Sequence, residues 1–221
     1  MFEQKKLDLH HNEFVRRVKG NDITLHTVVV PIVVNFNGAV WDAQSVIALA
    51  DALQFSTSIQ TLDVEPSARF WNERLKNKVS NLEVFNSVAR AIENNNTITR
   101  LVLARFSGCI SDKGAMTLAA SLRTNSVIEE LQLHENAIGD RGVAAIADVL
   151  TANHALRRLN LANNMIVDVG ACRIAAMLRK NTTLTDLNLD GKDQQRWCCG
   201  HCHCSEGKAQ TSNAALELEQ Y

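Results

Sequence analysis

The stretch LQLHENAIGDRGVAAIADVL, residues 131–150, places four side chains with acid, base or metal-binding chemistry close together. His134, Glu135, Asp140 and Arg141 fall within eight positions. An imidazole beside carboxylates is a common set for general acid–base catalysis or for holding a metal ion. The stretch lacks the second histidine of a zinc-protease helix, and the chain has neither a Gly-rich phosphate loop after a strand nor a G-x-S-x-G motif. We therefore predict no catalytic residue.

An internal repeat gives the same residues a structural explanation. Ten positions within residues 131–153 recur 28 residues later with an unchanged residue type. They are Leu131, Leu133, Asn136, Ile138, Asp140, Gly142, Ile146, Ala147, Leu150 and Asn153. Looser units begin at ITRLVL, residues 98–103, and at IQTLDV, residues 59–64, and VVNFNGAVWDAQSVIALADALQFSTS fits a degenerate first unit with Val34 and Phe36 in its strand.

The residue spacing predicts the elements of each unit. Leu131 and Leu133 have the period of two that is typical of a short strand with one buried face. Ile146, Val149 and Leu150 have the spacing of three and four that indicates a helix. Each unit is therefore a strand followed by a helix, and stacked units form a parallel sheet covered by helices on one side.

Polar residues mark the ends of these elements. We expect Asp140 to cap the first turn of its own helix, and Asn153 to take a left-handed conformation after that helix. The Asn136 amide, just past the strand, is expected to satisfy turn backbone in neighbouring units. These assignments make the opening cluster scaffold rather than catalytic machinery.

The pattern L-x-L-x-x-N-x-I-x-D-x-G in residues 131–150 and 159–178 resembles the ribonuclease-inhibitor-type leucine-rich repeat family. Members include the repeats of NACHT-type receptors, tropomodulin-like proteins and the Ran GTPase activator. The resemblance implies an α/β solenoid of about five repeats, with a curved parallel sheet on the concave side, helices on the convex side, and protein binding as its usual function. We divide the chain into an N-terminal cap segment, 1–30, the repeat domain, 31–189, and a polar Cys/His-containing tail, 190–221.

Residues between the strand leucines are expected to face the concave side. The first such row reads Arg100, Glu130, Arg158, Asp186, so the sign of the charge alternates from strand to strand. Such a row is either a cross-strand ladder of ion pairs or a docking strip for a partner of mixed charge. The concave residues predicted to bind a protein are Arg100, Glu130, Gln132, His134, Arg158, Asn160 and Asp186.

An insertion and the tail stand outside the repeat pattern. EPSARFWNERLKNK, residues 65–78, carries Arg69, Phe70, Trp71 and Arg74. Aromatic and arginine side chains are typical interface hot spots, and the alternative is that Phe70 and Trp71 seal the first repeats.

In the tail we expect a fold-back over the last unit or disorder. Its cluster comprises Cys198, Cys199, His201, Cys202, His203 and Cys204.

That cluster suits zinc or acylation, but no second pair of ligands is visible, so we predict no metal and no cofactor. Lys+Arg and Asp+Glu nearly cancel at 23 against 24, which argues against a nucleic-acid partner. The longest apolar run is too short for a membrane span, and the crowded cysteines favour a reducing, cytoplasmic setting.

The sequence thus predicts a non-enzymatic module that binds an unidentified protein partner. The alternatives are a regulator of an enzyme, such as a GTPase activator, and a metal- or lipid-linked sensor acting through the tail.

Overall fold

Helices and strands alternate along the chain in a computed structural model that describes residues 11–25, 27–32, 43–66, 81–105 and 110–191. The helices within these ranges are α2 (His11–Lys19), α3 (Ala43–Leu53), α4 (Asn81–Asn94), α5 (Asp112–Thr124), α6 (Asp140–Leu150) and α7 (Asp168–Leu178). The strands are β1 (Thr27–Ile32), β2 (Thr61–Pro66), β3 (Arg100–Val102), β4 (Glu130–Gln132), β5 (Arg158–Asn160) and β6 (Asp186–Asn188).

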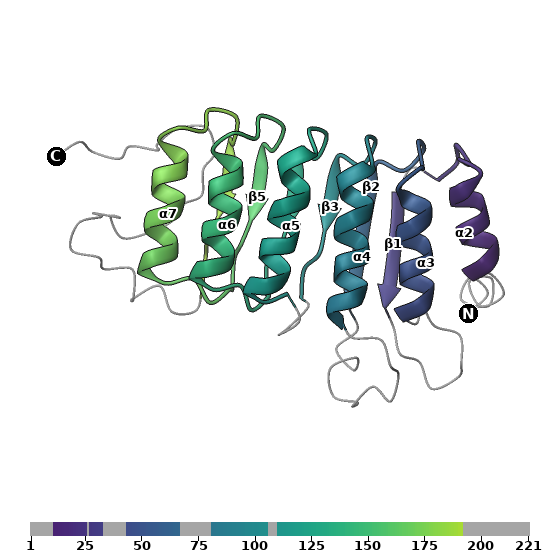
Figure 1. Cartoon of the computed structure of the whole chain (residues 1–221), viewed down its shortest axis with the longest axis horizontal. Coiled ribbons are helices and arrows are strands. Elements are labelled where there is room, and N and C mark those ends of the chain that lie inside the picture. Colours follow the sequence, from purple (N-terminus) through teal and green to yellow (C-terminus); the bar gives the residue numbers. More distant parts are fainter. Residues whose placement is uncertain (1–10, 26, 33–42, 67–80, 106–109, 192–221) are drawn as a thin grey trace.

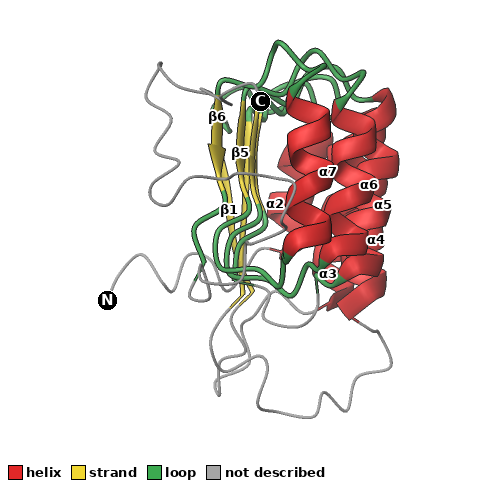
Figure 2. Cartoon of the chain, turned by 90° about the vertical axis from the view of Figure 1, so that its left-hand side faces the viewer, coloured by secondary structure: helices red, strands yellow, loops and turns green. Residues whose placement is uncertain are grey.

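The strands form one parallel sheet in the order β1-β2-β3-β4-β5-β6, so each strand pairs with its neighbours in the sequence. The helix between two strands returns the chain to the same end of the sheet, as parallel pairing requires. Figure 1 shows the helices side by side in chain order, and Figure 2 shows the strands as one layer and the helices as the other. The α/β solenoid predicted from the repeat is confirmed.

The core lies between these two layers. Leu131, Leu133 and Ile138 have an exposed fraction of 0%, and Ile146 and Leu150 on α6 have 1% and 0%. The spacing of two along the strand and of three and four along the helix therefore both mark buried positions, as predicted. Equivalent residues of successive units join one continuous apolar cluster.

A buried asparagine ladder holds successive units together at the turn between helix and strand. In Asn153, Nδ2 donates to the carbonyl oxygens of Leu122 and Asn125 in the preceding unit, at 3.0 and 3.1 Å. Its Oδ1 accepts from the backbone N–H groups of Ala155 and Leu156, at 3.0 and 2.9 Å. The same fourfold pattern occurs at Asn95, Asn125 and Asn181.

This ladder corrects the role expected for Asn153. The residues with left-handed backbone are Asn21, Arg105, Glu135 and Asn163 among those described, and Asn153 is not one of them. Its carboxamide is required instead, because it pairs buried backbone groups that would otherwise lack partners. The role predicted for Asn136 is confirmed, since its Nδ2 donates to the carbonyl oxygens of two consecutive units.

The helix-start aspartates also act between units rather than within their own helix. The N-cap of α6 is Gly139, and this residue makes no side-chain hydrogen bond that caps the helix. Asp140 Oδ1 accepts from the backbone N–H of Val167 in the next unit, at 2.9 Å. Asp112 Oδ1 likewise accepts from Gly139 and Gly142, both at 2.8 Å. The prediction that Asp140 caps its own helix is wrong, because the carboxylate reaches the neighbouring helix start.

The N-terminal side of the sheet begins earlier than the sequence suggested. β1 starts at Thr27, within the segment 1–30 that we assigned as a cap, and Val28 is in register with Leu62 of β2. α2 precedes β1 and packs against α3. The strand positions expected at Val34 and Phe36 lie outside the described residues. Val28 and Val30 alternate along the chain in the same way as Val34 and Phe36. Both pairs therefore fit the strand pattern of the first unit.

Candidate functional site

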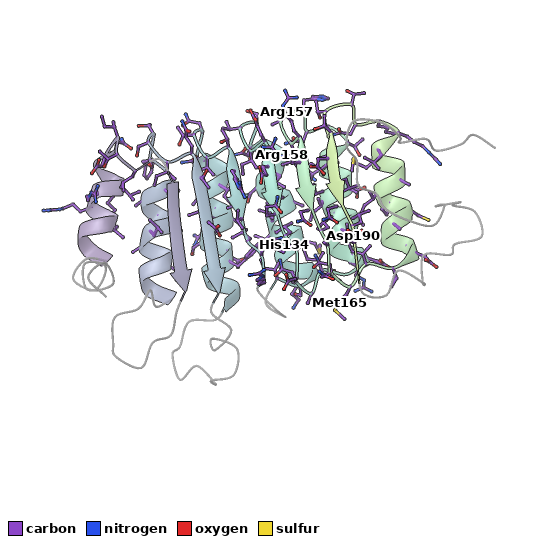
Figure 3. The ribbon with its side chains drawn as sticks, turned by 180° about the vertical axis from the view of Figure 1, so that it is seen from behind. His134, Arg157, Arg158, Met165 and Asp190 are labelled. Carbon is purple, nitrogen blue, oxygen red and sulfur yellow. The ribbon has the colours of Figure 1, made fainter. Side chains whose placement is uncertain are left out.

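The sheet face opposite the helices, called here the open face, carries the residues predicted to bind a partner. Arg100, Glu130, Arg158 and Asp186 are paired in register across β3, β4, β5 and β6. The leucines that follow them are buried, as expected for alternating strand residues. Figure 3 views the molecule from the strand side and labels Arg158 and His134 on this face.

Three residues of this row form what we call the arginine–glutamate cluster: Arg100, Glu130 and Arg158. Glu130 Oε2 accepts from Arg158 Nε and Nη2, at 3.0 and 2.8 Å. Glu130 Oε1 lies 3.2 Å from Arg100 Nε and accepts from Gln132 Nε2 at 3.1 Å. The Glu130 side chain is only 9% exposed, whereas each arginine side chain is 50% exposed. A covered carboxylate thus orients two guanidinium groups that remain open to solvent.

The cluster keeps its charges at neutral pH. Burial alone raises the pKa of Glu130, but the hydrogen bond from Arg158 opposes it, together with Gln132 and the positive charges of both arginines. The net result is a pKa below the usual value for this carboxyl group. One anion between two cations leaves the cluster with one net positive charge. Its exposed N–H groups are donors with a fixed orientation, which suits recognition of carboxylates.

Asp186 takes part in the row but not in the cluster. It pairs in register with Arg158, yet no ion pair within 4.0 Å joins these two described residues. Arg158 already directs both Nε and Nη2 toward Glu130. The alternating ladder expected from the sequence is therefore formed on the Glu130 side only, and Asp186 remains an exposed anion at the edge strand.

The middle of the open face is polar and partly buried. Asn160 Oδ1 accepts from the backbone N–H of Ala162 at 3.0 Å, which leaves its amide nitrogen to face His134 Nδ1 at 3.4 Å. His134 Nδ1 then acts as the acceptor, and the imidazole proton lies on Nε2. Burial lowers the pKa of His134, Glu135 opposes that effect, and Arg105 adds to it. The neutral imidazole is a contact group rather than an extra cation.

One pair on this side of the molecule was missed by sequence reasoning. Arg105 and Glu135 follow β3 and β4, and Arg105 Nε lies 3.3 Å from Glu135 Oε1. Both residues have left-handed backbone, with φ of 64° and 58°. Nothing in a non-glycine pair of charged residues signals that conformation, and the two-residue insertion before Ile110 obscured their alignment.

The four residues that opened the question of catalysis are engaged separately. His134 contacts Asn160 on the open face, and Glu135 contacts Arg105. Asp140 accepts from Val167 at a helix start, and Arg141 is exposed there. Among the residues that the structure describes, no group of three or more His, Cys, Asp or Glu side chains is arranged to hold a metal ion.

Two sets of predicted residues lie outside the described part of the chain. They are Arg69, Phe70, Trp71 and Arg74 of the insertion, and the tail cluster Cys198, Cys199, His201, Cys202, His203 and Cys204. Within the described ranges, no helix combines the length and apolar character needed to cross a membrane.

Comparisons with known proteins agree with this fold. A family model described as Leucine Rich repeat matches residues 124–147. No curated protein sequence matches the chain. The tropomodulin C-terminal domain of Caenorhabditis elegans is similar in structure, with 13% identity and a TM-score of 0.50 over 85% of this chain and 88% of that chain. A leiomodin-1 structure titled actin-binding site 2 has 21% identity and a TM-score of 0.47, over 84% and 82%. The chain contains a leucine-rich repeat, and its fold is an α/β leucine-rich-repeat solenoid.

Proposed function

We propose that the chain is a non-enzymatic protein-interaction module that binds its partner through the open face. The observation that carries the proposal is the arginine–glutamate cluster. Its two arginine side chains are held by a covered carboxylate and are still 50% exposed. A side chain that is already ordered loses less conformational entropy on binding, so such a pair is well suited to an interface.

The charges of the row specify the kind of partner. Arg100 and Arg158 lie on the strands on either side of β4, and both guanidinium groups contact the Glu130 carboxylate, so they lie closer together than the strands that carry them. Two carboxylates at a similar spacing on the partner would each meet one guanidinium. Asp186, exposed on the adjacent strand, complements a cation beside them. The partner is therefore a protein surface with two acidic groups followed by a basic one.

Gln132, His134 and Asn160 complete the proposed contact surface. They lie on β4, just after it, and on β5, and each is partly buried. Their amide and imidazole groups offer hydrogen bonds without additional charge. These bonds would set the register of the partner, while the arginines supply most of the attraction.

We also propose that the insertion, residues 65–78, makes a second contact with the partner. Phe70 and Trp71, flanked by Arg69 and Arg74, have the composition of an interface hot spot. We also propose the ribonuclease-inhibitor type of repeat, on the ground of its 28-residue period, and a reducing cytoplasmic setting, on the ground of the clustered cysteines.

Comparative capture from a cell lysate tests the proposal. The full chain is used as bait beside a variant carrying Arg100→Gln and Arg158→Gln, since glutamine retains a donor for Glu130 but removes the charge. The control carries Arg123→Gln and Arg141→Gln, two exposed arginines of the helix layer. We expect at least one protein to be captured by the parent and the control and lost by the open-face variant. Capture of the same proteins by all three baits would refute binding through this face.

A further inference from the structure

The charged row of the open face is complementary to itself when its order is reversed. From β3 to β6 the row reads Arg100, Glu130, Arg158, Asp186, so a cation at one end corresponds to an anion at the other. A second copy with the opposite strand order would place its Asp186 over Arg100 and its Arg158 over Glu130. Each charge of the row then faces an opposite charge, which is the pattern of an electrostatically matched interface.

One symmetry operation produces this arrangement. A two-fold axis that lies between two facing sheets and runs parallel to their strands reverses the strand order and keeps each row opposite itself. With the axis midway between β4 and β5, every position of the charged row meets its opposite. With the axis between β3 and β4, or between β5 and β6, only half of the positions do, and an axis on a strand brings like charges together. The charge pattern therefore favours a single alignment.

The middle row of the open face is matched in the same alignment. Gln132 of one copy lies opposite Asn160 of the other, because these residues are in register on β4 and β5. Gln132 Nε2 donates to Glu130, which leaves the Gln132 side-chain oxygen as an acceptor. Asn160 Oδ1 accepts from the N–H of Ala162, which leaves the Asn160 amide nitrogen as a donor. Each Gln132 acceptor thus meets an Asn160 donor of the other copy.

The residues just before the strands repeat the charge pattern. Glu129 and Arg157 precede β4 and β5, and both are exposed. Among the described residues, no ion pair within 4.0 Å includes Glu129, Arg157 or Asp186. Figure 3 labels Arg157 close to Arg158, at the edge of the sheet. The same two-fold axis places Glu129 of one copy opposite Arg157 of the other, so charges without an ion pair inside the chain gain one between chains.

The shape of the face permits a close approach. Viewed along the row of units, the strands overlap as one narrow layer (Figure 2), so neighbouring strands form a nearly flat surface. Ala104 and Ala162, which follow β3 and β5, are 7% and 6% exposed and do not project from that surface. The alignment places His134 of one copy opposite Ala162 of the other, where a small side chain leaves room for the imidazole.

We propose that the open face binds a second copy of this chain, in a two-fold dimer whose axis runs parallel to the strands between β4 and β5. The dimer rests on the function proposed above, because it names the partner of the same face. The second copy presents the surface described there, with anions opposite Arg100 and Arg158 and a cation opposite Asp186. Because the matched groups are charged and polar, the association is reversible and weakens as the salt concentration rises.

Sedimentation equilibrium of the purified full chain tests the dimer. We expect a monomer–dimer equilibrium whose dissociation constant rises at least about tenfold between about 50 mM and about 500 mM salt. A chain that stays monomeric up to its solubility limit in low salt would overturn the dimer. Such a result would leave binding of a different protein by the open face intact, because capture from lysate reports on that binding separately.

Exchange of charges tests the alignment. Asp186→Arg alone and Arg100→Asp alone each place like charges at both ends of the row, so each should weaken self-association at least about tenfold. An equimolar mixture of the two variants restores opposite charges in the heterodimer, and its dissociation constant should return to within about threefold of the parent value. Arg123→Glu, in the helix layer, is the control and should leave self-association unchanged. A mixture that associates no better than the single variants would overturn the two-fold alignment.

A second pair of variants leaves the arginine–glutamate cluster intact. Glu129→Arg and Arg157→Glu each place like charges opposite one another in the homodimer, and their mixture restores opposite charges. We expect the same loss and recovery of association as for the first pair, with a smaller magnitude because these residues lie at the edge of the face. Association that both single variants retain in full would place the contact between copies on another surface and overturn the proposal.

Discussion

Two sets of polar residues recur from unit to unit: the asparagines in the turn between helix and strand, and the charged residues at the strand starts. The two sets differ in what surrounds them. Asn125, Asn153 and Asn181 are buried and make four hydrogen bonds each to backbone, and Asn181 also accepts one from the Thr183 hydroxyl. Arg100 and Arg158 are half exposed, and their bonds go to one side chain, Glu130.

This difference separates scaffold from binding surface. A side chain whose bonds all go to buried backbone has no capacity left for a partner, and its loss leaves buried groups unpaired. A half-exposed guanidinium keeps several N–H groups for another molecule. Polar residues of the turn therefore determine stability, whereas polar residues of the open face are available for recognition.

The largest effect that this comparison predicts is for the asparagine ladder. Asn153→Ala removes all four hydrogen bonds and leaves the carbonyl oxygens of Leu122 and Asn125 buried without a partner. We expect a loss of about 4 kcal/mol in the free energy of unfolding, measured by urea denaturation with circular dichroism.

Asn160→Ala on the open face is the matched control for that substitution. Its side chain bonds one backbone group, the N–H of Ala162, and approaches His134. The expected loss is about 1 kcal/mol or less. Equal losses for the two substitutions would remove the distinction between scaffold and binding surface.

A smaller effect is expected for Glu130→Gln, and it depends on pH. The pKa of Glu130 is lowered in the folded protein from the ordinary value of 4.5, so its ionised form stabilises the fold. That contribution is complete well above pH 4.5 and is lost as the pH falls through the lower, folded-state pKa. Near neutral pH we expect the substitution to cost about 1–2 kcal/mol, and the difference from the parent should shrink in acid.

The control for Glu130 is Asp186→Asn, in the same row. Asp186 is exposed and makes no ion pair with Arg158 within 4.0 Å. We expect the stability of this variant to follow that of the parent across the same pH range. A pH-dependent loss at Asp186 matching that at Glu130 would show that the row acts as one continuous ladder.

The smallest effect concerns the first position of the ladder, where the chain has Asp22 instead of asparagine. Val28 is in register with Leu62, and Asp22 stands six residues before it, as Asn125 stands six before Leu131. Hydrogen bonds from the side chain and backbone of Thr24, and then from Arg17, lower the pKa of Asp22 from 3.8 to about 2.

Carboxyl titration by nuclear magnetic resonance checks this value. Asp22 should titrate at about 2, and Thr24→Ala should move its pKa back toward 3.8. Its contribution to stability is present above pH 3.8 and is lost as the pH falls through about 2. A pKa of 3.8 or higher in the parent would mean that Thr24 and Arg17 do not stabilise the ionised carboxylate of Asp22.

Much of the fold was predictable because the repeat preserves residue types. Leu131 and Leu133 alternate, Ile146 and Leu150 follow helical spacing, and Arg100 and Glu130 align across strands by counting alone. These relations depend on backbone periodicity, which the sequence displays directly.

The side-chain partners were not predictable in the same way. Asp140 and Asn153 have types suited to the ends of their own helix, but Asp140 Oδ1 accepts from Val167, 27 residues away, and Asn153 Nδ2 donates to Leu122, 31 residues away. The burial of Glu130 depends on two arginines from different strands closing over it. Such contacts depend on how the units stack in space. A repeat pattern indicates that the units stack but does not specify which side chains then meet.

The central claim is that the open face, through Arg100 and Arg158, binds a protein partner. The most direct test is the affinity of a protein captured by the parent chain, measured by titration calorimetry for the parent and both double variants. Arg100→Gln with Arg158→Gln should weaken binding by about tenfold or more, with a smaller salt dependence, and Arg123→Gln with Arg141→Gln should leave it within about twofold. Equal affinity for all three chains would contradict the claim and place the binding surface elsewhere.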